Sequence, residues 1–391
     1  MLISPVVRIG RGVRRIAALC LALILGISLA ACGGGSSGGD ANTLNVLTWE
    51  TYHDQAWLDA FTKDTGIKVN AVNVGSPDEM FAKIKANPSQ WDIGLVTSGW
   101  FDTYAKEGLL EPIDASKITT EPKLGFDWKG AASSDGKQYG VLYNWGDLPL
   151  VWIPGTVPDT PEMAKYKDAQ GRPNDWNILW DPAFKGKVSI FDDPTSVLPM
   201  IPLALGIADP YQLTPEQFTE TQNKLFELRS QIKRLTTGFN DQTAQFANGE
   251  ATIGYLNNIA AATALRKQGK AVEVNHQVKQ GVPAWSDNYS ITKAGAKKSD
   301  AVYKFINYTM TIPWQARFIA FSGNSGNLSL DQAKTPEAVA AGLNQEALDA
   351  TLIPATADGD AFFKGMKFFQ TVDDLNKRVD MWNQFKLGIA S

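Results

Sequence analysis

Side chains that could act as nucleophiles or metal ligands are scarce in this sequence. Its 391 residues include only two histidines and two cysteines, which are His53, His276, Cys20 and Cys32. These numbers exclude a zinc finger, a disulfide scaffold and a metal site built from several histidines. Neither histidine lies near a plausible serine in the sequence, so no serine triad is expected. The chemistry left is that of carboxylates, because a pair such as Asp193 and Asp287 could in principle cleave a glycoside.

The overall composition is that of an ordinary globular protein. Hydrophobic residues make up 44% of the chain and charged residues 20%, which is typical of chains that bury a core. The length allows two domains at roughly 100–200 residues each. The formal net charge is −4, so no positive excess exists to neutralise phosphates and nucleic acid is not an expected partner.

Aromatic and polar residues follow the strands predicted near the N-terminus. Hydrophobic patterning predicts strands over residues 44–48, 67–72 and 91–96, separated by helices that begin after Asp54 and Ser76, the second with a Ser76–Glu79 capping box. Alternating strands and helices predict a mostly parallel sheet, in which ligands bind beyond the carboxyl ends of the strands. The residues at these ends are Trp49, Glu50 and Tyr52 after the first strand, and Ser98, Gly99 and Trp100 after the third.

A second group of elements is predicted beyond residues 145–147. A strand over residues 188–191 ends in Asp192-Asp193-Pro194, and helices over 215–234 and 243–248 precede another strand at 252–255. The C-terminal third, from Ala301 onward, is predicted to be mostly helical. Its aromatic-rich segment is interpreted as core rather than site, and contains Phe362, Phe363, Met366, Phe368 and Phe369.

The first 32 residues have the pattern of an export signal. Arginines at positions 8, 11, 14 and 15 precede an apolar run over residues 16–31 that ends in Leu29-Ala30-Ala31-Cys32. The run is shorter than the ~20 residues that a membrane-spanning helix needs. The tetrad ending at Cys32 resembles the lipobox of bacterial lipoproteins, in which the cysteine is lipidated; a plain signal peptide is the alternative. The Gly/Ser stretch over residues 33–39 then predicts a tether that reaches roughly 15 Å.

Six segments, taken in order along the chain, carry a resemblance to a known family. They are residues 44–49, 65–69, 91–93, 106–114, 176–188 and 285–287. This ordered set resembles the polyamine-binding (spermidine/putrescine) branch of the bacterial extracellular solute-binding proteins, in lipoprotein form. The resemblance covers nearly the whole chain after the signal.

The resemblance implies an α/β, two-lobed periplasmic-binding-protein fold of type II. Each lobe is expected to be a mixed sheet flanked by helices, with the ligand in the cleft between the lobes. The implied organisation is a signal peptide over 1–31, a lipidated Cys32 and tether over 32–41, a first lobe over 42–147 and 287–331, and a second lobe over 148–286 and 332–391. The crossings between lobes are expected near residues 146–150, 284–287 and 331–335.

The resemblance also implies the residues that bind the ligand. Trp49, Tyr52 and Trp100 carry over as aromatic walls of the first lobe, with Ser98 beside them, and Trp285 as a stacking wall near a crossing. Asp193 and Asp287 carry over as the partners of ammonium groups. This set suits a polyamine, because aromatic faces cover methylenes and attract cations, while a buried ammonium needs a carboxylate. Alternatively, Asp193 caps a helix, Asp287 is a turn residue, and the tryptophans are core.

The sequence departs from the family pattern at four positions. Ser196 stands where a further acid is expected, and Asn257 and Asn324 stand where aromatic walls are expected. Glu50 stands where the family tends to have an uncharged residue, and could restore one charge. These differences favour a shorter diamine, another amine-bearing solute or a ligand with hydroxyl groups over spermidine.

The implied function is that of the extracytoplasmic solute-binding component of an ABC importer. Its partners would be a small organic cation and a membrane permease with a cytoplasmic ATPase. We expect no cofactor or metal, and a monomeric protein. We also expect the protein to be exported and held by the lipid on Cys32 to the membrane, on the outer (periplasmic or extracellular) face of that membrane. A sugar-binding protein of the same fold and a carboxylate-dependent hydrolase are the alternatives. An iron-binding protein is disfavoured because the chain has no Tyr-Tyr pair.

Overall fold

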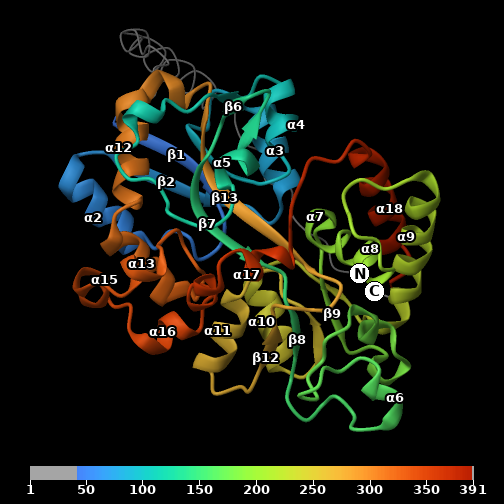
Figure 1. Ribbon diagram of the computed structural model, residues 1–391. Helices are drawn as coiled ribbons and strands as arrows, with labels where there is room; N and C mark the ends of the chain where they lie inside the picture. Colours follow the sequence, from blue (N-terminus) through green and yellow to red (C-terminus); the bar gives the residue numbers. More distant parts are fainter. Residues whose placement is uncertain (1–41, 390–391) are drawn as a thin grey trace, which may run out of the picture. The chain divides into compact units, whose positions relative to one another are not determined.

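Two β-sheets organise residues 42–389, the part of the chain that the computed structural model describes (Figure 1). The first sheet contains β1 (Thr43–Thr48), β2 (Lys68–Asn73), β3 (Ile93–Thr97), β4 (Leu110–Glu111), β7 (Val141–Asp147), β13 (Val282–Thr292) and β14 (Met366–Phe368). The second sheet contains β8 (Leu150–Trp152), β9 (Val188–Phe191), β10 (Leu235–Thr236), β11 (Ile253–Tyr255) and β12 (Glu273–Asn275). A separate two-stranded pair consists of β5 (Ser133–Ser134) and β6 (Lys137–Gln138).

The helices lie between and after these strands. Those of the first half are α2 (Gln55–Thr65), α3 (Pro77–Ala86), α4 (Phe101–Lys106), α5 (Trp128–Ala131), α6 (Pro161–Ala164), α7 (Pro194–Val197) and α8 (Met200–Ala204). Those of the second half are α9 (Pro215–Glu227), α10 (Phe239–Ala247), α11 (Ala260–Lys267), α12 (Ser299–Thr309), α13 (Ile312–Ser322), α14 (Leu330–Ala333), α15 (Pro336–Ala340), α16 (Gln345–Asp349), α17 (Asp360–Lys364) and α18 (Leu375–Lys386). The predicted helix over 215–234 therefore ends earlier, and the one predicted at 243–248 begins four residues sooner.

The first sheet is mixed. Its strand order is β14-β13-β3-β1-β2, and β1 is parallel to both β2 and β3, which confirms the parallel arrangement predicted for the first three strands. The long strand β13 pairs antiparallel with β3, β4 and β7, and parallel with β14. The second sheet has the order β10-β9-β11-β8-β12, with β9, β10 and β11 parallel and β8 antiparallel to its neighbours.

Local sequence signals explain where the first helices begin and end. The Asp54 side chain accepts a hydrogen bond from the Ala56 amide at the start of α2, and Gly66 ends that helix in the left-handed conformation with φ 74°. The Ser76 side chain caps α3, but the Glu79 side chain accepts from the Gly75 amide rather than from that of Ser76. The predicted capping box is therefore only half formed.

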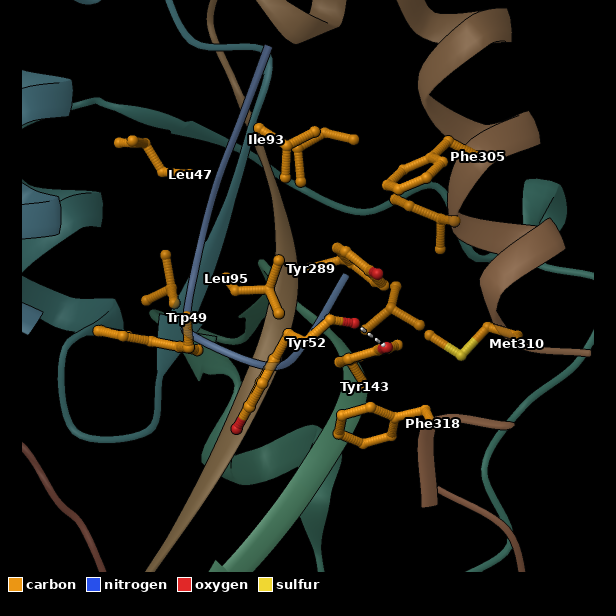
Figure 2. Packing of buried hydrophobic residues seen from close by; sticks show 14 of the residues in the cluster. Leu47, Trp49, Tyr52, Ile93, Leu95, Tyr143, Tyr289, Phe305, Met310 and Phe318 are labelled. Atoms are coloured by element: carbon orange, nitrogen blue, oxygen red, sulfur yellow. Dashed lines mark hydrogen bonds between the residues drawn. The ribbon is translucent and has the colours of Figure 1, made fainter. Parts of the chain in front are cut away.

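Each sheet has its own buried apolar cluster. The first cluster surrounds β1 and β3, and it includes Trp49, Tyr52 and Tyr143, whose hydroxyl donates to the Tyr52 carbonyl at 2.9 Å (Figure 2). The second cluster surrounds β9 and α8 and includes Trp176 and Trp382.

The packing of the C-terminal third bears on the crossing expected at residues 331–335. Residues on α14, α15 and α16, among them Ala333 and Leu348, pack in the first cluster, whereas Phe369 and Trp382 pack in the second. The chain therefore passes between the clusters near β14, because pairing with β13 holds it there. The crossing expected at residues 331–335 stays a prediction.

Two further observations concern the described residues as a whole. Within residues 42–389 no helix is both long and apolar enough to cross a membrane. In the same range no group of three or more His, Cys, Asp and Glu side chains is placed to hold a metal ion. The predicted signal peptide, Cys32 and the tether lie outside the described residues.

Candidate functional site

The carboxyl ends of strands from both sheets meet around one cavity of about 270 Å³. Its wall includes residues that lie one or two positions after the ends of β1, β2, β9, β10 and β11 in the sequence. These residues are Trp49, Glu50, Val74, Gly75, Asp193, Thr237, Gly238 and Asn257. Ligands of open α/β sheets bind at such strand ends. The strand order of the two sheets therefore accounts for the position of the cavity.

Asp287 is a buried carboxylate in the wall of the cavity. It lies on β13 between Thr97 on β3 and Asn144 on β7, next to a shift of register between β13 and β7. Its Oδ1 accepts a hydrogen bond from the Thr97 hydroxyl at 2.5 Å, and its Oδ2 accepts one from the Tyr52 hydroxyl at 2.5 Å. The Tyr52 oxygen in turn accepts from Asn144 Nδ2 at 2.9 Å. Asp287 is thus held in a strand by hydroxyl donors and is not a turn residue.

Asp193 is the second buried carboxylate of the wall. It lies two residues after the end of β9 and caps α7, since its Oδ1 accepts from the Thr195 amide at 2.9 Å. Its Oδ2 accepts from the Ser196 hydroxyl. The capping role predicted as an alternative is therefore present, and the same carboxylate also lines the cavity.

Burial raises the pKa of both carboxyl groups. Loss of water contact raises the pKa of Asp287 to about 7, although hydrogen bonds from Thr97 and Tyr52 act in the opposite direction. Burial likewise raises the pKa of Asp193 to about 7, the Ser196 hydrogen bond opposes this, and the negative charge of Asp78 adds to it. A third acid, Glu50, also lines the cavity, and the lining residues include no lysine, arginine or histidine. The cavity is therefore electrostatically suited to a cation.

Aromatic rings form much of the remaining wall. Trp49 and Trp285 line the cavity together with Tyr52, Phe191, Phe239 and Phe369. Trp285 packs against Gly146 on β7, where a Cβ atom would come within 2.8 Å of the indole ring. Only glycine leaves room for this indole, so the pairing of β7 with β13 fixes one aromatic face of the cavity.

Glu50 makes a contact that the sequence did not predict. Its Oε2 accepts a hydrogen bond from the Phe239 amide at 3.0 Å, at the first residue of α10. Glu50 follows β1 of the first sheet, whereas α10 follows β10 of the second. The carboxylate therefore bridges elements of both sheets at the rim of the cavity.

Eight of the eleven predicted ligand-binding residues line the cavity. They are Trp49, Glu50, Tyr52, Asp193, Ser196, Asn257, Trp285 and Asp287. At Asn257 the backbone amide donates to Gln242 Oε1 at 3.1 Å, whereas the side-chain oxygen is buried without a hydrogen-bond partner. This amide oxygen is free to accept a hydrogen bond from a ligand.

Three predicted residues do not line the cavity. The Ser98 hydroxyl accepts from the Ser286 amide at 3.1 Å, so it joins β3 to β13 instead. Trp100 packs against Phe81 and faces a smaller neighbouring cavity of about 40 Å³. Asn324 is fully buried after α13, and both of its side-chain polar atoms lack partners. Packing behind the strand ends, which sequence patterns do not report, places these three residues outside the lining of this cavity.

Several lining residues were missed by sequence reasoning. Thr97 ends β3 directly before Ser98, and its position at a strand end was a usable signal. Phe191 likewise ends a predicted strand. Phe369 was assigned to the core, and it does pack in the second cluster, but it also lines the cavity. No local pattern in the aromatic-rich segment distinguishes this residue from its neighbours.

Comparisons with known proteins agree with this geometry. A family model described as bacterial extracellular solute-binding protein matches residues 56–377. Spermidine/putrescine-binding periplasmic protein 1 of Haemophilus influenzae is 30% identical over 271 residues, which cover 69% of this chain and 71% of the relative. The spermidine/putrescine-binding periplasmic protein of Escherichia coli is 28% identical over 290 residues, covering 74% and 77%.

Solved structures show the same fold. The substrate-binding protein of a spermidine/putrescine ABC transporter from Streptococcus pneumoniae superposes with a TM-score of 0.66 at 23% identity, covering 89% of this chain and all of that one. This similarity confirms the predicted α/β, two-lobed fold of periplasmic binding proteins, with a mixed sheet flanked by helices in each lobe.

Proposed function

Because the chain belongs to the family of bacterial extracellular solute-binding proteins, we propose that it captures a polyamine-type cation, such as putrescine or spermidine, for an ABC importer. Members of this family are binding proteins and not enzymes, so the hydrolase alternative is not favoured. Relatives named for spermidine and putrescine binding support the proposed ligand class.

One observation carries the proposal. The cavity has three carboxylates in its wall, Glu50, Asp193 and Asp287, and no basic side chain among the residues that line it. A buried carboxylate without a cation is costly, and this cost appears in the raised pKa of Asp193 and Asp287. An ammonium group beside each of them would offset that cost.

The wall also suits the methylene chain of such a ligand. The faces of Trp49 and Trp285 can cover methylenes and attract the cationic ends, at about 0.5–2 kcal/mol per cation–π contact. Two paired ammonium groups and these walls support an affinity near micromolar, about −8 kcal/mol. Because Ser196 replaces an acid and donates to Asp193, a diamine with one ammonium at each aspartate is the ligand we favour.

The partners and location follow from the same role. The protein would deliver its ligand to a membrane permease with a cytoplasmic ATPase, and would act as a monomer outside the cytoplasm. We propose that the lipid on Cys32 holds it to the outer face of the membrane, and that ligand lies between a first lobe of residues 42–147 with 287–331 and a second lobe of residues 148–286 with 332–391.

A ligand panel tests the proposal. Thermal unfolding is measured with putrescine, cadaverine, spermidine, common sugars and amino acids. A ligand at 100 times its dissociation constant adds about 2.7 kcal/mol to the free energy of unfolding, so a diamine should raise the melting temperature and added salt should weaken its binding. Stabilisation by a neutral sugar alone, unaffected by salt, would instead establish the sugar-binding alternative.

A further inference from the structure

Helix α10 begins without a cap of its own. Its N-cap residue is Gly238, which has no side chain to accept a hydrogen bond from the first turn. The acceptor for the Phe239 amide is the carboxylate of Glu50, at 3.0 Å. A negative charge is favourable at a helix N-terminus, because the first amides and the helix dipole both attract it. The helix start is therefore completed by a residue from the other sheet.

The same helix holds part of the cavity wall. Gln242 on α10 accepts from the Asn257 amide at 3.1 Å and donates to the Tyr255 carbonyl at 3.0 Å. Gly238, Phe239 and Asn257 all line the cavity. A displacement of the start of α10 would therefore move three wall residues together.

We infer that Glu50 is a positioning residue: by capping α10 from the end of β1, it holds the second-sheet side of the cavity against the first-sheet side when ligand is bound. This inference rests on the proposed function. It differs from the hypothesis that Glu50 replaces the acid absent at Ser196, since its Oε2 already accepts from a backbone amide.

The two roles predict different responses to ligand charge. If a carboxylate that pairs with an ammonium group is neutralised, the protein loses more affinity for a diamine than for a monoamine. When a positioning residue is replaced, the affinities for the diamine and for the monoamine fall by the same factor. The change then affects the closed form of the protein and not one end of the ligand. Glutamine should also retain part of the effect, since its amide oxygen can still accept from Phe239.

The experiment compares Glu50→Ala and Glu50→Gln with wild type, using calorimetry with putrescine and with n-butylamine. Thr214→Ala is the matched control, because Thr214 caps α9 in an exposed position away from the cavity. A third variant, Glu50→Ala/Gly238→Ser, supplies a local cap to α10, and Gly238→Ser is measured alone to account for its own effect. Hydrogen exchange of the Phe239 amide is followed in every protein without ligand and at saturating putrescine.

We expect Glu50→Ala to lower the affinity for both amines by the same factor, roughly tenfold for a lost cap. Glu50→Gln should lower these affinities less. Exchange at Phe239 should accelerate in Glu50→Ala, whereas Thr214→Ala should lower the melting temperature only. The added serine should restore thermal stability without restoring affinity. The inference would be overturned if Gly238→Ser restored the full affinity to the Glu50→Ala protein. It would also be overturned if Glu50→Ala lost affinity for putrescine only, or if the exchange rate of the Phe239 amide stayed unchanged. If wild type binds neither amine, the proposed function fails, and Phe239 exchange still tests the cap.

Discussion

At the scale of single residues, the proposed pairing of ammonium groups with Asp193 and Asp287 would connect ligand binding to protonation. Both are buried, and burial raises the pKa of each to about 7 in the protein without ligand. A cation placed beside a carboxylate favours its charged form and therefore lowers this pKa. Binding of an ammonium group must then release any proton that the carboxylate holds.

This linkage predicts a pH-dependent affinity. Below pH 7 a proton competes with the ammonium group at each aspartate, so the affinity for putrescine should fall as the pH drops from 8 to 5.5 and should level off above about 8. Calorimetry in buffers of different ionisation enthalpy measures both the affinity and the protons released. An affinity that does not change over this range would contradict the pairing of ammonium groups with these two residues.

Asp287→Asn isolates one of the two carboxylates. Without a charge at this position, a buried ammonium is left unpaired, and we expect a loss of about 2–5 kcal/mol in binding free energy. Because the raised pKa makes the folded protein bind a proton that the unfolded chain releases, the Asp287 carboxyl lowers the free energy of unfolding as the pH rises from about 4 to 7. In chemical denaturation, the free energy of unfolding of the asparagine variant should therefore decline less steeply over this pH window than that of wild type. If the variant binds the cation as tightly as wild type does, the proposed role of Asp287 is excluded.

At the scale of elements, the parallel strands place the acids and rings. Residues after β1 and β9 line one cavity although they lie in different sheets, because the carboxyl ends of both sets of strands face it. The absence of a side-chain carbon at Gly254 on β11 permits this arrangement, since a Cβ atom there would lie 2.4 Å from the Ser189 carbonyl oxygen on β9. β11 and β9 can pair at this distance only with glycine.

Gly254→Ala should accordingly disturb the strand that carries Asp193. Overpacking of this kind costs about 1–3 kcal/mol, and separation of β9 from β11 would shift the start of α7, so both the melting temperature and the putrescine affinity should fall. Gly365→Ala is the control, because no heavy atom lies within 4 Å of its added Cβ and its φ is −78°. Equal effects of the two substitutions would show that strand spacing does not position the site.

Much of this arrangement was predictable from local sequence. The strand end after residue 48 indicated Trp49 and Glu50, and Asp54 and Gly66 marked the ends of α2, because these signals act within a few residues. Asp193 and Asp287 were expected only from the resemblance to the family. The start of α10 was not predictable, since its cap comes from Glu50, 189 positions away. The positions of Trp100 and Asn324 likewise depend on packing between distant segments, which local patterns do not encode.

At the scale of the whole molecule, the cavity is lined by residues of both sheets, so a ligand bound there, as we propose, would touch both. A ligand that pairs with Asp287 and Asp193 together favours the form in which these residues approach. We therefore expect closure of the two lobes on ligand, with a smaller radius of gyration in X-ray scattering at saturating putrescine than without it. The Glu50→Ala protein should need more putrescine to reach the same decrease, and an identical radius in both conditions would count against closure.

The export and anchoring of the chain make a separate prediction, because they depend on residues before position 42. If Cys32 carries a lipid, the Gly/Ser tether over residues 33–39 joins this anchor to the binding unit. All residues that line the cavity lie at or after Trp49 in the sequence. Cys32→Ser should then release the protein from membranes in soluble form with an unchanged putrescine affinity, since no cavity residue is altered. Fractionation of cells after a high-salt wash, followed by calorimetry on the released protein, measures both properties. A Cys32→Ser protein that stays with the membrane fraction would show that something other than this lipid holds it there, while a released protein with reduced affinity would show that anchor and cavity are not independent.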